Sequence, residues 1–152
     1  YSVNLQYIDM AYRSRKDVKR YKQHQMAEHA VTDCIFCDLG PGNDQFIKET
    51  KSFKVIRNIF PYESWDLQDV DDHLLLVPKR HIDSLNDLTR DEAVEYVDTI
   101  GSYESNSYNI WARAPQSVIK SVAHQHTQLM KPGNKQTKLL FYLKKPYFRF
   151  HR

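Results

Sequence analysis

Disulfide bonds and membrane spans are the features that this sequence most clearly lacks. The 152 residues include only two cysteines and four glycines, and no apolar run approaches the ~20 residues that cross a bilayer. No signal peptide is recognisable at the polar start. With 41% hydrophobic residues, we expect a globular, cytoplasmic protein with one packed core rather than a disulfide scaffold.

The two cysteines are spaced as C-x-x-C, at Cys34 and Cys37. In an intracellular protein such a pair is either half of a metal site or a redox pair. A redox pair of the thioredoxin type needs a βαβ context, which the neighbouring sequence does not show. Zinc would need two further ligands, typically histidines, and His81 and His124 are the candidates. The alternative is a reduced dithiol without metal.

Net charge is small, but basic residues are unevenly placed. The formal charge is +3, which suits a phosphate-bearing ligand without requiring nucleic acid. Residues 1–30 are basic, contain no Gly or Pro, and carry Leu5, Ile8 and Tyr12 at helical spacing. We therefore predict a basic helical N-terminal extension over 1–30, solvated at its surface, and a second unit over 31–152. The alternative is a lid or clamp for phosphates or RNA.

Polar residues alternate in the stretch 121–130, where apolar residues flank His124, His126 and Gln128. If this stretch is a β-strand, as we expect, the two imidazoles and the amide share one face. Imidazoles placed in this way suit metal ligation, nucleophilic catalysis or acid–base catalysis. The stretch is therefore the candidate active site.

The segment His124-Gln-His126-Thr-Gln128-Leu-Met resembles the active-site strand of the histidine-triad (HIT) superfamily, whose motif is His-x-His-x-His followed by two apolar residues. Glutamine in third place is similar to the branch of galactose-1-phosphate uridylyltransferase and dinucleoside-polyphosphate phosphorylase. The resemblance covers about residues 33–132. It implies an α+β fold: an antiparallel sheet of about five strands, a packed helix over 89–103 and assembly into a homodimer.

The resemblance also implies a structural zinc ion. The apolar run before Pro78, followed by His81, is similar to a family segment that ends in a zinc-binding histidine. Members of the transferase branch bind the metal with a C-x-x-C pair, that histidine and the first histidine of the motif. The matching residues in this chain are Cys34, Cys37, His81 and His124.

For catalysis, the resemblance implies that His126 attacks a phosphorus atom and forms a nucleotidyl-histidine intermediate. Gln128 would donate hydrogen bonds through its amide. It would not transfer a proton, because an amide cannot titrate near neutral pH. By spacing, Arg113, Lys120 and Ser121 fall at phosphate-binding positions. For Arg113 and Lys120, a solvent-facing loop charge is the alternative.

Nucleoside binding is expected at a second group of residues. Asn58 falls where the family places a polar residue that binds ribose hydroxyls, although a turn-forming role before Pro61 is equally compatible with the sequence. Apolar residues would enclose the base: Ile35, Phe36, Ile56, Ile59 and Leu75. The acidic insertion over 62–72, with Trp65, is either a solvated loop or a rim of this pocket.

The predicted function is nucleotidyl transfer, phosphorolysis or hydrolysis at a nucleoside polyphosphate or nucleotide-sugar phosphate bond. One alternative is a nucleotide-binding regulatory protein with little turnover. Another is a nucleic-acid-associated protein that uses the basic N-terminus and the aromatic tail over 138–152, where we expect one edge strand. Membrane binding is not expected.

Overall fold

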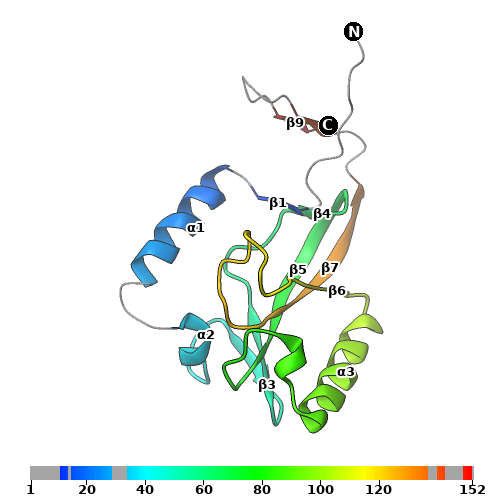
Figure 1. The fold of residues 1–152 in the computed structure, drawn as a ribbon. Helices are drawn as coiled ribbons and strands as arrows, with labels where there is room; N and C mark the ends of the chain where they lie inside the picture. The colour runs from blue at the N-terminus through cyan, green and yellow to red at the C-terminus, as the bar shows by residue number, and fades with distance from the viewer. Residues whose placement is uncertain (1–10, 14, 29–33, 137–139, 143–148, 152) are drawn as a thin grey trace.

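The computed structural model describes residues 11–13, 15–28, 34–136, 140–142 and 149–151 (Figure 1). Residues 1–10 of the predicted N-terminal extension and much of the tail therefore lie outside the described residues. The helices are α1 (Arg15–Glu28), α2 (Ile35–Asp38), the 3₁₀ turn η1 (Leu85–Asp87) and α3 (Arg90–Glu104). The strands are β1 (Ala11–Tyr12), β2 (Phe46–Glu49), β3 (Phe53–Arg57), β4 (Ser64–Trp65), β5 (Gln68–Pro78), β6 (Asn109–Ala112), β7 (Thr127–Gln136), β8 (Leu140–Tyr142) and β9 (Arg149–His151).

A seven-stranded antiparallel sheet organises the fold, with the long strand β5 at its centre. On one edge β5 pairs with β3, which pairs with β2; on the other it pairs with β7, which pairs with β6. The predicted count of about five strands corresponds to these five. The two-residue strands β1 and β4 extend the sheet at one end of β5. The predicted α+β fold with one packed helix is confirmed.

The two faces of the sheet carry separate apolar clusters, as the period of two along each strand requires. The helix α3 covers one face, where Tyr96 and Ile100 pack against buried residues that include Val55 and Leu76. Its start is fixed by a capping box of Thr89 and Glu92. The short α2 and the residue that follows it cover the other face through Phe36 and Leu39 (Figure 1). No helix among the described residues is long and apolar enough to cross a membrane.

The prediction of a strand over 121–130 is wrong in its first half. The ladder between β5 and β7 ends at the pair Leu76↔Thr127, so His124 and His126 lie in the loop before β7. Beyond Leu76, β5 ends two residues later at Pro78, which has no N–H to donate to a continued ladder. The backbone N–H of Gln125 instead donates to the carbonyl of Ile82, at 2.6 Å.

The structure differs from the sequence-based expectation at two further segments. The insertion over 62–72 is neither a simple loop nor fully solvated, because β4 and the start of β5 form a tight hairpin that turns at Asp66 and Leu67, both with positive φ. The expected edge strand of the tail is instead a pair, β8 and β9, which bond to each other in a separate two-stranded sheet.

Candidate active site and metal centre

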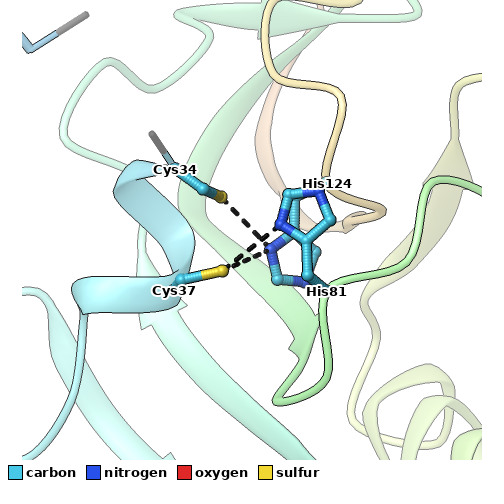
Figure 2. Close-up of side chains that lie close together, drawn as sticks. All are labelled: Cys34, Cys37, His81 and His124. Carbon is cyan, nitrogen blue, oxygen red and sulfur yellow. Dashed lines mark hydrogen bonds between the residues drawn. The ribbon is translucent and has the colours of Figure 1, made fainter. Parts of the chain in front are cut away.

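The four predicted metal ligands lie together, with their ligand atoms all within 4.8 Å of one another. Figure 2 shows the two cysteines of the α2 turn facing the imidazoles of His81 and His124. The Sγ atom of Cys34 is 3.4 Å from Nδ1 of His124, and Sγ of Cys37 is 3.3 Å from Nδ1 of His81. Tetrahedral zinc with ordinary bond lengths separates sulfur and nitrogen ligands by about 3.6 Å. The donor set and its spacing therefore fit zinc.

The outer nitrogen of each imidazole has an oxygen partner, as expected for metal-binding histidines. Nε2 of His124 donates to the carbonyl of Pro78 at 3.0 Å, which leaves a lone pair on Nδ1 toward the sulfurs. Nε2 of His81 lies 3.5 Å from a carboxylate oxygen of Asp83. Burial lowers the pKa of His124 to about 4, so its ring is neutral at pH 7. Both rings thus present Nδ1 to the cluster.

Lys54 reaches under the α2 turn from β3, a contact that the sequence did not reveal. Its ammonium group is buried and donates to the carbonyls of Leu39 and Cys37. Desolvation and the neighbouring Cys34 thiol raise the pKa of the Cys37 thiol to about 11. A bound zinc ion would overcome this cost by replacing the thiol protons, while the lysine anchors the turn.

The predicted nucleophile, His126, is only 7% exposed and packs edge-on against Phe36, with 5.1 Å between ring centroids. Its Nδ1 lies 2.9 Å from the carbonyl oxygen of His124. A carbonyl only accepts, so Nδ1 carries the proton and Nε2 keeps a lone pair. Burial lowers the pKa of His126, and the charges of Lys120 and Arg113 lower it further. The ring is therefore neutral at pH 7.

The residue His124 connects the two sites. Its ring belongs to the Cys/His cluster, and its carbonyl holds the ring of His126. The same loop is tied to the segment after β5, because Lys120 donates to the carbonyl of Asp83 at 3.0 Å. The metal cluster and the candidate nucleophile therefore share one backbone unit.

The predicted site residue Gln128 has a partner that we did not predict, His73 on β5. The backbone N–H of Tyr62 donates to Nδ1 of His73 at 3.1 Å, so the ring proton lies on Nε2. That nitrogen donates to Oε1 of Gln128. The amide is thereby oriented with its oxygen occupied and its NH₂ group available. Burial lowers the pKa of His73 to about 4, which keeps this neutral tautomer at pH 7.

The three predicted phosphate ligands lie on the loop between β6 and β7. Arg113 donates to the hydroxyl of Tyr62 at 3.2 Å and lies over the ring of Trp111, 4.4 Å from its centroid. Lys120 and Ser121 are half-buried. Neither Arg113 nor Lys120 forms a salt bridge with any residue that the structure describes. Both side chains are nevertheless half-buried and hydrogen-bonded within the protein, so they are not simply solvent-facing.

The predicted nucleoside residues divide into two groups. Phe36, Ile56 and Leu75 share one buried cluster, and Ile35 packs against it. Ile59 is 40% exposed and lies outside that cluster. Asn58 serves as a turn residue, since its side-chain oxygen accepts from the N–H of Phe60 at 2.9 Å. Its amide nitrogen lies 3.2 Å from Nε2 of His73, beside the Gln128 pair.

Comparison with known proteins points to one family. The family model described as "Scavenger mRNA decapping enzyme C-term binding" matches residues 33–139. No curated protein matches the chain at a significant level. Among solved structures, a HIT family hydrolase from Legionella pneumophila has a TM-score of 0.51 and 22% identity, covering 70% of this chain and 96% of its own. A Zn-bound histidine triad family protein from Mycobacterium smegmatis has a TM-score of 0.50 and 21% identity, covering 74% and 84%. At these identities the likeness shows the fold alone.

Proposed function

The chain belongs to the scavenger mRNA decapping enzyme C-terminal family, within the histidine-triad superfamily, and we propose that it transfers nucleotidyl groups through His126. The substrate class is a nucleoside polyphosphate or a nucleotide sugar. The observation that carries this proposal is the state of the His126 ring. Its Nδ1 is held by the His124 carbonyl, and within the described residues its Nε2 has no hydrogen-bond partner. A neutral imidazole with one fixed nitrogen is an activated nucleophile.

In the first step, the Nε2 lone pair attacks the α-phosphorus of the bound nucleotide. An N–P bond forms, the P–O bond to the leaving phosphate breaks, and the leaving oxygen takes the electron pair. In the second step an oxygen of phosphate or water attacks the same phosphorus, and the N–P bond breaks with its electron pair returning to Nε2. An attacking water releases its proton to the solvent. The cations of Arg113 and Lys120 would stabilise the charge on the phosphate oxygens, with Ser121 as a further donor.

The residue Gln128 favours transfer between phosphates in this proposal. Because His73 occupies its oxygen, the amide can offer only N–H groups to the substrate. These groups can stabilise a phosphate oxygen but cannot supply a proton to an amine or alkoxide leaving group. A phosphate leaving group needs no proton. Phosphorolysis or transfer of substrates with a phosphate leaving group is therefore expected to be faster than hydrolysis of substrates with an amine leaving group.

We further propose that zinc occupies the Cys34, Cys37, His81 and His124 cluster and has a structural role. The metal would supply rigidity rather than chemistry, because all four protein ligands would fill a tetrahedral ion. The fit of the sulfur–nitrogen distances and the Zn-bound M. smegmatis relative both support this assignment. A homodimer, which the sequence resemblance implies, and a cytoplasmic location, which the composition suggests, stay predictions.

The test is intact-mass spectrometry at neutral pH after incubation with diadenosine tetraphosphate or with UDP-glucose. Wild-type protein should gain the mass of one nucleotidyl group, and His126→Ala should not. Zinc content and the melting temperature of His126→Ala serve as controls for folding. Binding of either probe without adduct or turnover would instead indicate a regulatory binding protein. Salt-sensitive binding to oligonucleotides alone would indicate a nucleic-acid-associated protein.

A further inference from the structure

Four side chains form a column that runs from the N-terminal segment to the candidate active site. The guanidinium carbon of Arg13 lies 4.2 Å from the ring centroid of Tyr62. On β5, the ring of His73 stacks against Tyr62, with 5.1 Å between centroids and 22° between planes. His73 in turn holds the amide oxygen of Gln128. Arg13 is therefore connected through three contacts to a residue beside the nucleophile.

The position of Arg13 is fixed by the chain on both sides of it. The strand β1 pairs with β4, in the register Ala11↔Trp65 and Tyr12↔Ser64. The Nε atom of Arg13 donates to the carbonyl of Phe60 at 2.8 Å. From α1, the ring of Tyr21 lies 5.1 Å from the guanidinium carbon. These contacts place the basic segment against the residues that precede β4.

Tyr62 links this segment to the tautomer of His73. Its ring lies between Arg13 and the imidazole, and its backbone N–H supplies the hydrogen bond to Nδ1. If Tyr62 moves away, Nδ1 loses its donor and the proton can move from Nε2 to Nδ1. The amide of Gln128 would then turn its NH₂ group to the imidazole and its oxygen toward the substrate. An amide oxygen in that place repels a phosphate.

We propose that Arg13 is a positioning residue of the active site, which braces Tyr62 against His73 and so keeps the amide donors of Gln128 aimed at the substrate. Its effect on turnover rests on the function proposed above, whereas its effect on His73 does not. On this view Arg13 is part of the catalytic unit, rather than one charge of the solvated extension that the sequence suggested.

The charges around His73 agree with this role. Burial is the main cause of its lowered pKa, and the cations of Arg13 and of any protonated His126 act in the same direction. Asp72, its neighbour on β5, acts in the opposite direction. Removing the charge of Arg13 should therefore raise the pKa of His73.

The experiment compares Arg13→Met with the matched control Arg20→Met. Arg20 lies on α1 with a side chain 62% exposed, and it forms a salt bridge with Asp17 at 3.5 Å. The tautomer and pKa of His73 are followed by ¹⁵N imidazole spectroscopy, and adduct formation is followed in single turnovers with diadenosine tetraphosphate. Arg13→Met should raise the pKa of His73 and slow the adduct about twofold to thirtyfold, the range that a cation–aromatic contact spans. Arg20→Met should change neither.

A second variant tests whether the hydroxyl of Tyr62, rather than its ring and backbone N–H, holds His73. Tyr62→Phe removes only the hydroxyl that accepts from Arg113, and it keeps the ring and the backbone N–H. It should therefore leave the tautomer of His73 unchanged. An unchanged pKa and tautomer of His73 in folded Arg13→Met would overturn the proposal. If wild-type protein forms no adduct, the proposed function fails, and the imidazole spectra still decide the role of Arg13.

Discussion

Lowering the pH should destabilise the fold through His73, by an amount that the structure allows us to calculate. The ring is 2% exposed, and its pKa is lowered from 6.5 to about 4. Between these values the unfolded chain binds a proton that the folded chain excludes, so stability falls as the pH drops from 6.5 toward 4. The full difference of 2.5 units corresponds to about 3.4 kcal/mol, and the part lost between pH 7 and pH 5 is about 1.8 kcal/mol.

The assay is urea denaturation at pH 7.0 and pH 5.0, with wild-type protein and His73→Gln. Glutamine keeps a hydrogen-bonding group but does not titrate. The change in unfolding free energy between the two pH values should be about 1.8 kcal/mol larger for wild type than for the variant. Contributions from His124, His126 and the carboxylates are common to both proteins and cancel in this comparison. Equal losses would show that His73 protonates freely in the folded state, and would refute its assignment as a buried neutral donor to Gln128.

Two further predictions concern the metal cluster and the sheet. Cys37→Ser removes one of the four candidate ligands, so zinc measured by plasma mass spectrometry should fall from about one ion per chain to nearly none; full retention would exclude the proposed cluster. Gly133→Ala should destabilise the protein by about 1–3 kcal/mol, because the new Cβ would lie 2.5 Å from a carboxylate oxygen of Asp69, whose other oxygen accepts from the backbone N–H of Lys135 and so resists displacement. The control Gly101→Ala, on α3 with nothing within 4 Å, should instead stabilise it by about 0.5–1 kcal/mol in thermal melts.

Local sequence signals predicted those features that depend on local chemistry. Thr89 and Glu92 cap α3 as their spacing indicates, because a capping box needs only residues within one turn. Each candidate metal ligand also lies in a short segment of recognisable pattern, and the structure brings the four segments together. The central strand β5 follows from an apolar run that is long enough to be covered on both faces.

Contacts between distant segments could not be predicted from the sequence alone. The bond between His73 and Gln128 joins residues 55 positions apart and depends on the register between β5 and β7. The alternation of polar residues alone could not show that β7 begins only at Thr127, since that boundary depends on Pro78 in another strand. The sequence predicts only a solvated charge at Arg13, because the pairing of β1 with β4 is what places it over Tyr62.

The most direct test of the account is to identify the nitrogen that carries the nucleotidyl group. ¹⁵N–³¹P coupling in trapped, ¹⁵N-histidine-labelled protein distinguishes the two nitrogens of each imidazole. We predict an N–P bond at Nε2 of His126, because Nδ1 of that ring is bound to the His124 carbonyl. A phosphorus bonded to Nδ1 of His126, or to any other histidine, would contradict the account.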